Sequence, residues 1–396
     1  MAGRRKRKGR LGLLILVIFL ALVIAGGYIL WQGGYLDGLI PPPGGASDSD
    51  GGYSDSSSDS GSDSSSDSSS DSGSGGDIVT EELSIHFPML GNKSSGDCTL
   101  IKAGDTEVLI DAGSERSSAA TLVPYISEYC TDGVLEYVIV THADQDHIAA
   151  FVGTNSIPGI FETFECGIII DFPRTNKDTQ VYNDYVELRD AEVEAGAVHY
   201  TALDCWNNAG GASRSYTLSE GITMNFLYQR FYEEYSSDEN NYSVCMLLTQ
   251  GQNNYLFTGD LEAEGEESLV AENDLPECKL FKAGHHGSPT SNGTTLMAEI
   301  RPEIVVVCCC CGNYKEYKFG SMDVVFPSQA FVDNVAPYTD QIYIPTLYSE
   351  TKGFVPMNGN IVVTSVGDGL SVRCSNNDIL FKDTEWFREN RTWPEG

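Results

Sequence analysis

One short segment limits what this chain can fold into more than any other feature. Residues 141–147 read Thr-His-Ala-Asp-Gln-Asp-His and directly follow the apolar run 137–140. The run predicts a buried strand, and a strand that ends in such a cluster turns several nitrogen and oxygen atoms toward one point at its C-terminal edge. These atoms are ligands of divalent metals. The segment therefore predicts a metal site, with a polar, hydrogen-bonded turn as the alternative.

The use of histidine supports the metal site. The chain has six histidines, and four of them lie in this segment and in a second pair, His285 and His286. Histidine is a common ligand of metals, and histidines scattered over the surface would not concentrate in this way. The other two, His86 and His199, stand alone, and we expect them to be ordinary structural or surface residues.

The first 31 residues predict a membrane anchor. Residues 4–10 hold six Lys or Arg, and residues 11–31 are apolar apart from three glycines. A run of about 20 apolar residues can cross a bilayer as a helix, and the basic end 1–10 before it should stay in the cytoplasm. We expect a single-pass anchor in the cell membrane with an extracellular body. A signal peptide cleaved near residues 23–25 is the alternative.

Residues 32–79 predict a linker between the anchor and the body. Segment 47–76 is almost wholly Ser, Asp and Gly. Such a composition cannot bury a core, so we expect a disordered, solvated and extended spacer. The folded body is expected over residues 80–376. The tail 377–396 is polar and aromatic, and the sequence leaves open whether it packs on the body.

Four of the eleven cysteines are consecutive, at 308–311, and follow the apolar residues 304–307. On a strand, successive side chains alternate between the two faces, so all four cannot bind one metal. We therefore interpret them as small apolar residues in a buried strand.

Two segments of the body resemble each other. The first runs from Cys98 through a turn at 104–105 to Asp111, and the second runs from Ser243 through a turn at 251–254 to Asp260. Each is typical of a β-hairpin that ends in an aspartate and leads into a helical stretch. Each is followed by a further strand that leads to histidines. We therefore predict an α/β fold, a sheet sandwich flanked by helices, with the metal between two similar halves.

Five stretches stand in a characteristic order: 109–113 (Leu-Ile-Asp-Ala-Gly), 142–147 (His-Ala-Asp-Gln-Asp-His), 240–244 (Asn-Asn-Tyr-Ser-Val), 257–260 (Phe-Thr-Gly-Asp) and 282–288 (Lys-Ala-Gly-His-His-Gly-Ser). Together they resemble the metallo-β-lactamase fold superfamily. The likeness is greatest to the extracellular domain of ComEC-type competence proteins and their stand-alone relatives. The resemblance covers residues 82–374 and implies a four-layer αββα sandwich that acts as a metal-dependent hydrolase.

The resemblance also implies roles for individual residues. The implied metal ligands are His142, Asp144, Asp146, His147, Asp260 and His285. Asp111 would support these ligands from behind. Asp146 would orient the attacking water or accept its proton, and His285 or His286 would protonate the leaving group. Asp144 stands where the superfamily usually has a histidine, so the site is richer in oxygen. This shifts the expected cofactor from zinc toward manganese, with one or two ions bound.

One departure from the family pattern leaves alternatives open. Relatives often have a His-Pro pair late in the domain, where this chain has Phe326 and Pro327. The site would then hold one metal firmly and a second weakly, or its activity would be impaired. A hydrolase of a small ester or lactone, and a catalytically decayed surface binding protein, are the competing hypotheses.

The resemblance implies a phosphodiester substrate, with DNA as one example. Charge argues against a polyanion, because residues 11–396 carry 18 basic against 57 acidic side chains. Nonspecific affinity for DNA comes largely from Lys and Arg that replace counterions. The sequence therefore leaves nucleic-acid binding open.

Overall fold

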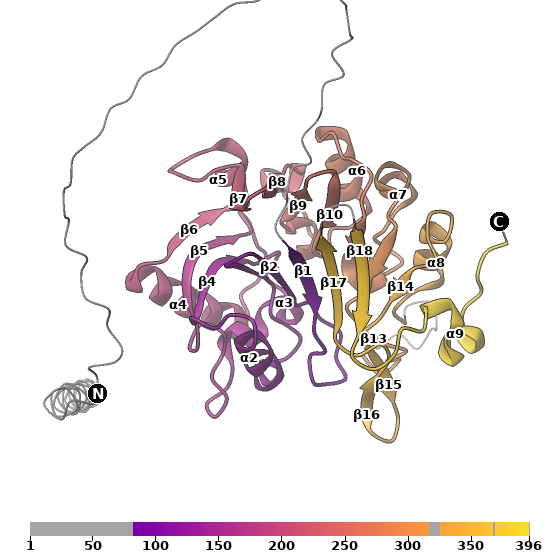
Figure 1. Ribbon diagram of the computed structural model, residues 1–396. Helices are drawn as coiled ribbons and strands as arrows, with labels where there is room; N and C mark the ends of the chain where they lie inside the picture. Colours follow the sequence, from indigo (N-terminus) through magenta and orange to yellow (C-terminus); the bar gives the residue numbers. More distant parts are fainter. Residues whose placement is uncertain (1–81, 317–324, 367–368, 396) are drawn as a thin grey trace, which may run out of the picture. The chain divides into compact units, whose positions relative to one another are not determined.

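The computed structural model describes residues 82–316, 325–366 and 369–395, which all belong to one compact unit. Figure 1 shows their arrangement. The expected basic end, the anchor and the whole of the expected linker lie outside the described residues. Among the helices that are described, none has both the length and the apolar character needed to cross a membrane.

The first sheet has eight strands in the order β18-β17-β1-β2-β3-β4-β5-β6. Their bounds are Leu83–Phe87 (β1), Thr99–Ala103 (β2), Thr106–Ile110 (β3), Val134–Ile139 (β4), Glu165–Asp171 (β5), Val198–Thr201 (β6), Ile361–Val366 (β17) and Gly369–Cys374 (β18). Neighbours from β18 to β3 pair antiparallel, and neighbours from β3 to β6 pair parallel.

The second sheet has seven strands in the order β14-β12-β11-β10-β9-β8-β7. Their bounds are Ser215–Ser219 (β7), Ile222–Leu227 (β8), Cys245–Gln250 (β9), Asn253–Phe257 (β10), Leu280–Lys282 (β11), Ile304–Val306 (β12) and Ile342–Tyr343 (β14). Strands β7 to β10 form an antiparallel meander, and β10, β11, β12 and β14 run parallel. A small third sheet holds Cys310–Cys311 (β13), Thr346–Ser349 (β15) and Gly353–Pro356 (β16).

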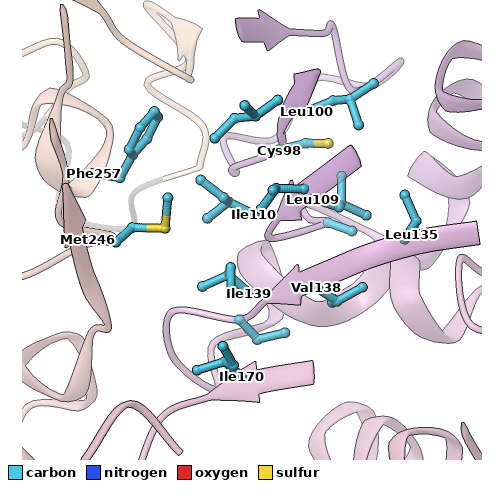
Figure 2. Close-up of a cluster of buried hydrophobic side chains, with 14 of the residues drawn as sticks. Cys98, Leu100, Leu109, Ile110, Leu135, Val138, Ile139, Ile170, Met246 and Phe257 are labelled. Atoms are coloured by element: carbon cyan, nitrogen blue, oxygen red, sulfur yellow. The ribbon is translucent and has the colours of Figure 1, made fainter. Parts of the chain in front are cut away.

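The two large sheets pack face to face through apolar side chains. Figure 2 shows Ile110, Ile139 and Ile170 of the first sheet facing Met246 and Phe257 of the second. The three isoleucines are neighbours in register on parallel strands, so they project to the same face. The main hydrophobic core therefore lies between the sheets.

Helices cover the outer faces of both sheets. On the first sheet they are α2 (Ala119–Ser127), α3 (Gln145–Val152) and α4 (Gln180–Ala195), and on the second they are α6 (Ala263–Glu272), α7 (Thr294–Ile300) and α8 (Gln329–Val335). The remaining short helices are η1 (Arg116–Ser118), α5 (Ala202–Asn207), η2 (Arg230–Tyr232), η3 (Glu239–Tyr242), η4 (Gly284–Gly287), η6 (Phe381–Asp383) and α9 (Glu385–Asn390). The layers follow the order helices, sheet, sheet, helices (Figure 1), as predicted.

The two similar segments predicted from the sequence are confirmed as equivalent hairpins. Strands β2 and β3 form one antiparallel hairpin, and β9 and β10 form the other. Each hairpin is followed by a parallel neighbour, β4 after β3 and β11 after β10. Parallel neighbours end at the same edge of their sheet. Asp111 and the 141–147 segment therefore share one edge, and Asp260 and the histidine pair share the corresponding edge of the second sheet.

The predicted burial of the cysteines is confirmed, but the predicted single strand is wrong: β12 ends at Val306, Cys308 and Cys309 lie in an irregular segment, and only Cys310–Cys311 form a strand, β13 of the small sheet. All eleven are free thiols, and ten of them are buried. Cys308 belongs to the core between the sheets, whereas Cys309 and Cys311 belong to the core under the outer helices. The structure also decides what the sequence left open for the tail, since Phe381 and Phe387 are buried in that outer core.

Candidate metal centre

The central motif lies where β4 runs into α3. His142 and Asp144 occupy the loop between the two elements, and Asp146 and His147 lie in the first turn of the helix. Asp144 is the N-cap residue and has an extended backbone, so the chain turns sharply there. A strand end and a helix start thus bring the four side chains to the same edge of the first sheet.

Four side chains from three segments converge at this edge. One ligand atom from each of Asp146, His147, Asp260 and His286 lies within 4.8 Å of the others. Asp260 Oδ2 is 3.1 Å from His147 Nε2 and 3.3 Å from His286 Nε2. Asp146 Oδ2 is 3.3 Å from His286 Nε2. We call these four residues, together with His142, the metal centre.

Each histidine of the metal centre is held from behind through Nδ1. His147 Nδ1 donates to Asp111 Oδ2 at 2.7 Å, and His286 Nδ1 donates to the carbonyl oxygen of Cys308 at 2.8 Å. His142 Nδ1 lies 3.2 Å from Thr141 Oγ1. A histidine that uses Nδ1 in this way presents Nε2 to a metal. Asp111 therefore lies behind His147, where the resemblance implies a supporting residue.

The atoms that face the metal centre mainly contact one another. The Nε2 atoms of His142, His147 and His286, together with Asp260 Oδ1, are buried and form no hydrogen bond of good geometry with the described residues, although those of His147 and His286 lie 3.1 and 3.3 Å from Asp260 Oδ2. A buried polar atom without a partner costs about 1–3 kcal/mol, so such atoms rarely cluster without a purpose. Imidazole nitrogens and carboxylate oxygens are a donor set that suits zinc and manganese. The residues present therefore fit a divalent cation.

The backbone at the metal centre is unusual. Asp111 has φ 58°, His285 has φ 45° and His286 has φ 53°. Residues other than glycine avoid this left-handed region, and it is strained where they adopt it. Such strain persists only where the surrounding structure enforces it. The three residues lie just after β3 and β11. Their strained backbone directs the side chains toward the metal centre at the edge of the sheets.

Two charged residues that the sequence analysis did not select lie beneath the metal centre. Asp97 precedes β2, and Lys282 ends β11; their side chains are 4% and 3% exposed and form an ion pair. Lys282 Nζ also lies 3.7 Å from Asp260 Oδ1. Burial alone would raise the pKa of Asp97, but the ammonium of Lys282 and the imidazole of His286 hold it below its usual range. The pair is therefore ionised.

The nearby carboxylates set the pKa values of His147 and His286. Burial by itself would lower the pKa of His147 and of His286, but Asp260 and the other nearby carboxylates raise both pKa values well above the usual range. A field that holds protons on two buried imidazoles also attracts a divalent cation. Metal binding would release these protons, because only a neutral imidazole is a ligand.

Three residues that the resemblance implies as ligands, His142, Asp144 and His285, lie outside the group of four. The ring of His142 is adjacent, with its centroid 4.1 Å from that of His147. Asp144 forms an ion pair with Lys177, and its other oxygen is 3.7 Å from His142 Nε2. The side chain of His285 is 22% exposed, and its Nδ1 lies 3.5 Å from Glu262 Oε1. The structure brings His286 into the group and leaves His285 at the rim.

Phe326 lies against the histidine pair. Its ring centroid is 5.6 Å from that of His285 and 5.9 Å from that of His286, and the side chain is buried. An aromatic ring offers no metal ligand. This side of the metal centre is therefore apolar, where a histidine in that place would add a nitrogen.

Replacing Asp111 with asparagine should weaken the binding of manganese about 10- to 100-fold, as is typical when the partner behind a ligating histidine is changed. Asp111 accepts bonds from His147 Nδ1, Thr141 N and Thr141 Oγ1. The amide oxygen of asparagine can accept only part of these bonds, and its NH₂ group can accept none. Calorimetric titration with Mn²⁺ measures the effect. Asp184→Asn, which breaks a surface pair with Arg116, is the matched control. Equal affinities for wild type and Asp111→Asn would contradict this role.

Comparison with known proteins finds a family match and several relatives. The family model described as "Metallo-beta-lactamase superfamily" matches residues 91–153, the part of the chain that holds the 141–147 segment. Among solved structures, the metallo-beta-lactamase fold protein YhfI from Bacillus subtilis is 14% identical, with 67% of this chain and 96% of that chain covered and a TM-score of 0.37.

Three curated proteins are similar to this chain. Recombination protein 2 of Haemophilus influenzae is 25% identical over 58% of this chain and 25% of its own length. Competence protein ComA of Neisseria gonorrhoeae is 25% identical over 55% of this chain and 26% of its own length. ComE operon protein 3 of Bacillus subtilis is 23% identical over 57% of this chain and 30% of its own length. The match thus spans between a quarter and a third of each relative. The chain thus carries a match to the metallo-β-lactamase superfamily in residues 91–153 and is related in sequence to the ComEC-type competence proteins.

Proposed function

We propose that this protein is a metal-dependent hydrolase of phosphodiesters, with DNA among its substrates. The observation that carries the proposal is the metal centre itself. Three buried imidazoles, fixed through Nδ1, lie beside the carboxylates of Asp146 and Asp260, and their Nε2 atoms form no hydrogen bond of good geometry. This arrangement suits one or two zinc or manganese ions.

A bound cation would supply hydroxide at neutral pH, since it lowers the pKa of water from about 16 to about 7, and it would polarise a phosphoryl oxygen. Asp146 is the most exposed carboxylate of the metal centre, with 40% of its side chain accessible. Burial would raise its pKa, but the hydrogen bond to His286 holds the pKa below the usual range. An ionised Asp146 can therefore orient the attacking water or accept its proton.

The leaving group needs a proton donor on the open side of the metal centre. His285 lies at the rim and is held by contacts of its Nδ1 with Asn240, Glu262 and Thr290 at 3.3–3.5 Å. Its exposed position suits transfer of a proton to a departing oxygen. His286 is buried and lies within 3.3 Å of three carboxylates, those of Asp97, Asp146 and Asp260. This favours a role as a ligand. We therefore assign the proton donor to His285 in preference to His286.

DNA is favoured as the phosphodiester by the names of the relatives, which include a recombination protein and competence proteins. The charge of −33 disfavours long-range attraction of a polyanion. We therefore expect local contacts to bind the substrate. The apolar run 11–31 and the basic residues before it support an anchor in the cell membrane, with the hydrolase domain outside.

The proposal predicts cleavage of DNA that depends on metal. Full-length protein loaded with manganese or zinc should cleave single- or double-stranded DNA. His142→Ala should reduce the rate by at least about 100-fold, because one imidazole ligand is lost. His199→Ala is the matched control, since that half-buried histidine pairs with Asp171 outside the metal centre. Rates and metal content are measured on the same samples.

The outcomes separate the alternatives. Bound metal without cleavage of DNA would point to a smaller phosphoester, an ester or a lactone. If the protein neither binds metal nor cleaves DNA, the result would favour a decayed, surface-bound binding protein. The apolar contact of Phe326 with His285 and His286 is the observation that keeps this last alternative under test.

A further inference from the structure

A half-buried lysine lies beside the metal centre, on the loop that follows β5. Lys177 Nζ forms an ion pair with Asp144 Oδ1, and the other oxygen of this carboxylate lies 3.7 Å from His142 Nε2. The side chain of Lys177 is 30% exposed, so its ammonium is at the rim and not in the core. One carboxylate thus separates a solvent-accessible positive charge from a histidine of the metal centre.

The loop that carries Lys177 is held by a buried carboxylate from a distant part of the chain. Glu239, in η3, accepts hydrogen bonds from Thr175 Oγ1 at 2.6 Å and from the backbone nitrogen of Asn176 at 2.7 Å. The backbone nitrogen of Lys177 donates to Thr175 Oγ1 at 2.9 Å. These bonds fix the loop before a ligand arrives, which lowers the entropic cost of binding.

The position of Lys177 is notable in so acidic a chain. Acidic residues outnumber basic ones 57 to 24. Within the described ranges, the lysines that pair with carboxylates at this edge are Lys177 and Lys282. Lys282 is buried and bound to Asp97. Arg174, on the same loop as Lys177, donates to the carbonyl oxygen of Glu233. Among the residues that the structure describes, Lys177 is therefore a cation placed to meet a ligand from solvent.

We propose that Lys177 binds a non-bridging oxygen of a phosphodiester and so selects this anionic class over neutral esters, an inference that rests on the proposed function. A lysine ammonium is a common phosphate ligand and acts as a point charge. Asp144 holds the ammonium in place before the substrate arrives, and the substrate oxygen then shares it. A neutral ester offers no such charge, so its hydrolysis does not depend on Lys177.

Kinetics with two small substrates test the proposal on the full-length, manganese-loaded protein. Bis(p-nitrophenyl) phosphate is an anionic diester, and p-nitrophenyl acetate is a neutral ester. In Lys177→Met we expect KM for the diester to rise about 10- to 100-fold, the range for loss of a hydrogen bond to a charged group. The KM for p-nitrophenyl acetate should change by less than about threefold, the effect expected from loss of an exposed ion pair. Lys177→Arg should restore part of the affinity for the diester.

Binding of inorganic phosphate gives a readout that does not require activity. Calorimetric titration with inorganic phosphate is done on the metal-free and the metal-loaded proteins. The affinity of Lys177→Met for phosphate should be lower than that of the wild type by about tenfold or more. Lys279→Met is the matched control, because Lys279 has a similar exposure of 35% and pairs with Glu303 elsewhere. Neither phosphate affinity nor KM should change in that variant.

Two results would overturn the proposal. Equal losses on both substrates with unchanged phosphate affinity would mean that Lys177 acts only by positioning Asp144. No effect in any assay would mean that the ion pair is a surface feature alone. If the wild-type protein hydrolyses neither substrate, the proposed function fails, while the phosphate titration still decides whether Lys177 binds this anion.

Discussion

Asp260→Asn should lower metal-dependent hydrolysis by about 10³-fold or more, the largest loss of activity that we expect from one isosteric change. Asp260 follows β10 and contacts His147, His286 and Lys282. It is the carboxylate that joins the two halves of the fold at the metal centre. Loss of a charged ligand removes several kcal/mol of charge stabilisation from the transition state, and each 1.36 kcal/mol is about tenfold in rate.

The change should act through metal binding and not through collapse of the fold. Burial would raise the pKa of Asp260, but His147 and His286 hold it well below the usual range. The carboxylate is therefore ionised, and asparagine removes that charge with little change in volume. Metal content should fall together with the rate, while circular dichroism in the near ultraviolet should stay close to that of the wild type.

Asp340→Asn is the control for Asp260→Asn. Asp340 pairs with Lys382 at the surface, outside the metal centre, so both metal content and rate should match the wild type. A chelator should reduce wild-type activity to the level of Asp260→Asn, and added manganese should restore only the wild type. If Asp260→Asn kept its metal and its rate within about threefold of the wild type, Asp260 would not be part of the centre.

The sequence predicted the layout of the site because hairpins leave a local pattern. Two apolar runs joined by a short turn, each pair ending in an aspartate, indicated that Asp111 and Asp260 take equivalent places in two halves. Strand pairing in the structure bears this out. The direction of parallel strands then brings the histidines to the same edge, so that His142, His147 and Asp260 could be proposed from spacing and resemblance.

Other features of the metal centre could not be read from the sequence. Asp97 stands at the start of a strand, and it reaches the site only because β2 runs antiparallel to β3. The choice between His285 and His286 depends on two left-handed backbone angles, and neither angle has a sequence signal. Lys282 is the last residue of an apolar strand, where a lysine more often marks an exposed end. Each of these depends on tertiary contacts between distant segments.

Lys282→Met should cause the largest loss of stability, about 3–5 kcal/mol in the free energy of unfolding. The side chains of Lys282 and Asp97 are almost fully buried and paired, and Lys282 Nζ also donates to the carbonyl oxygen of Gly259 at 3.2 Å. Methionine keeps the length of the side chain but leaves the carboxylate of Asp97 buried without its ammonium. Such a loss is a large part of the 5–15 kcal/mol typical of a folded domain.

Urea unfolding in the presence of a chelator measures this effect, because a bound cation would replace part of the lost charge. Asp97→Asn and the double variant Lys282→Met/Asp97→Asn complete a double-mutant cycle. The double variant should be more stable than the sum of the single effects predicts, by about 1–3 kcal/mol, since neither charge is then left alone. Additive effects would mean that the two residues are not energetically coupled. A positive coupling would show that a fixed internal ion pair holds β2 and β11 together directly beneath the metal centre.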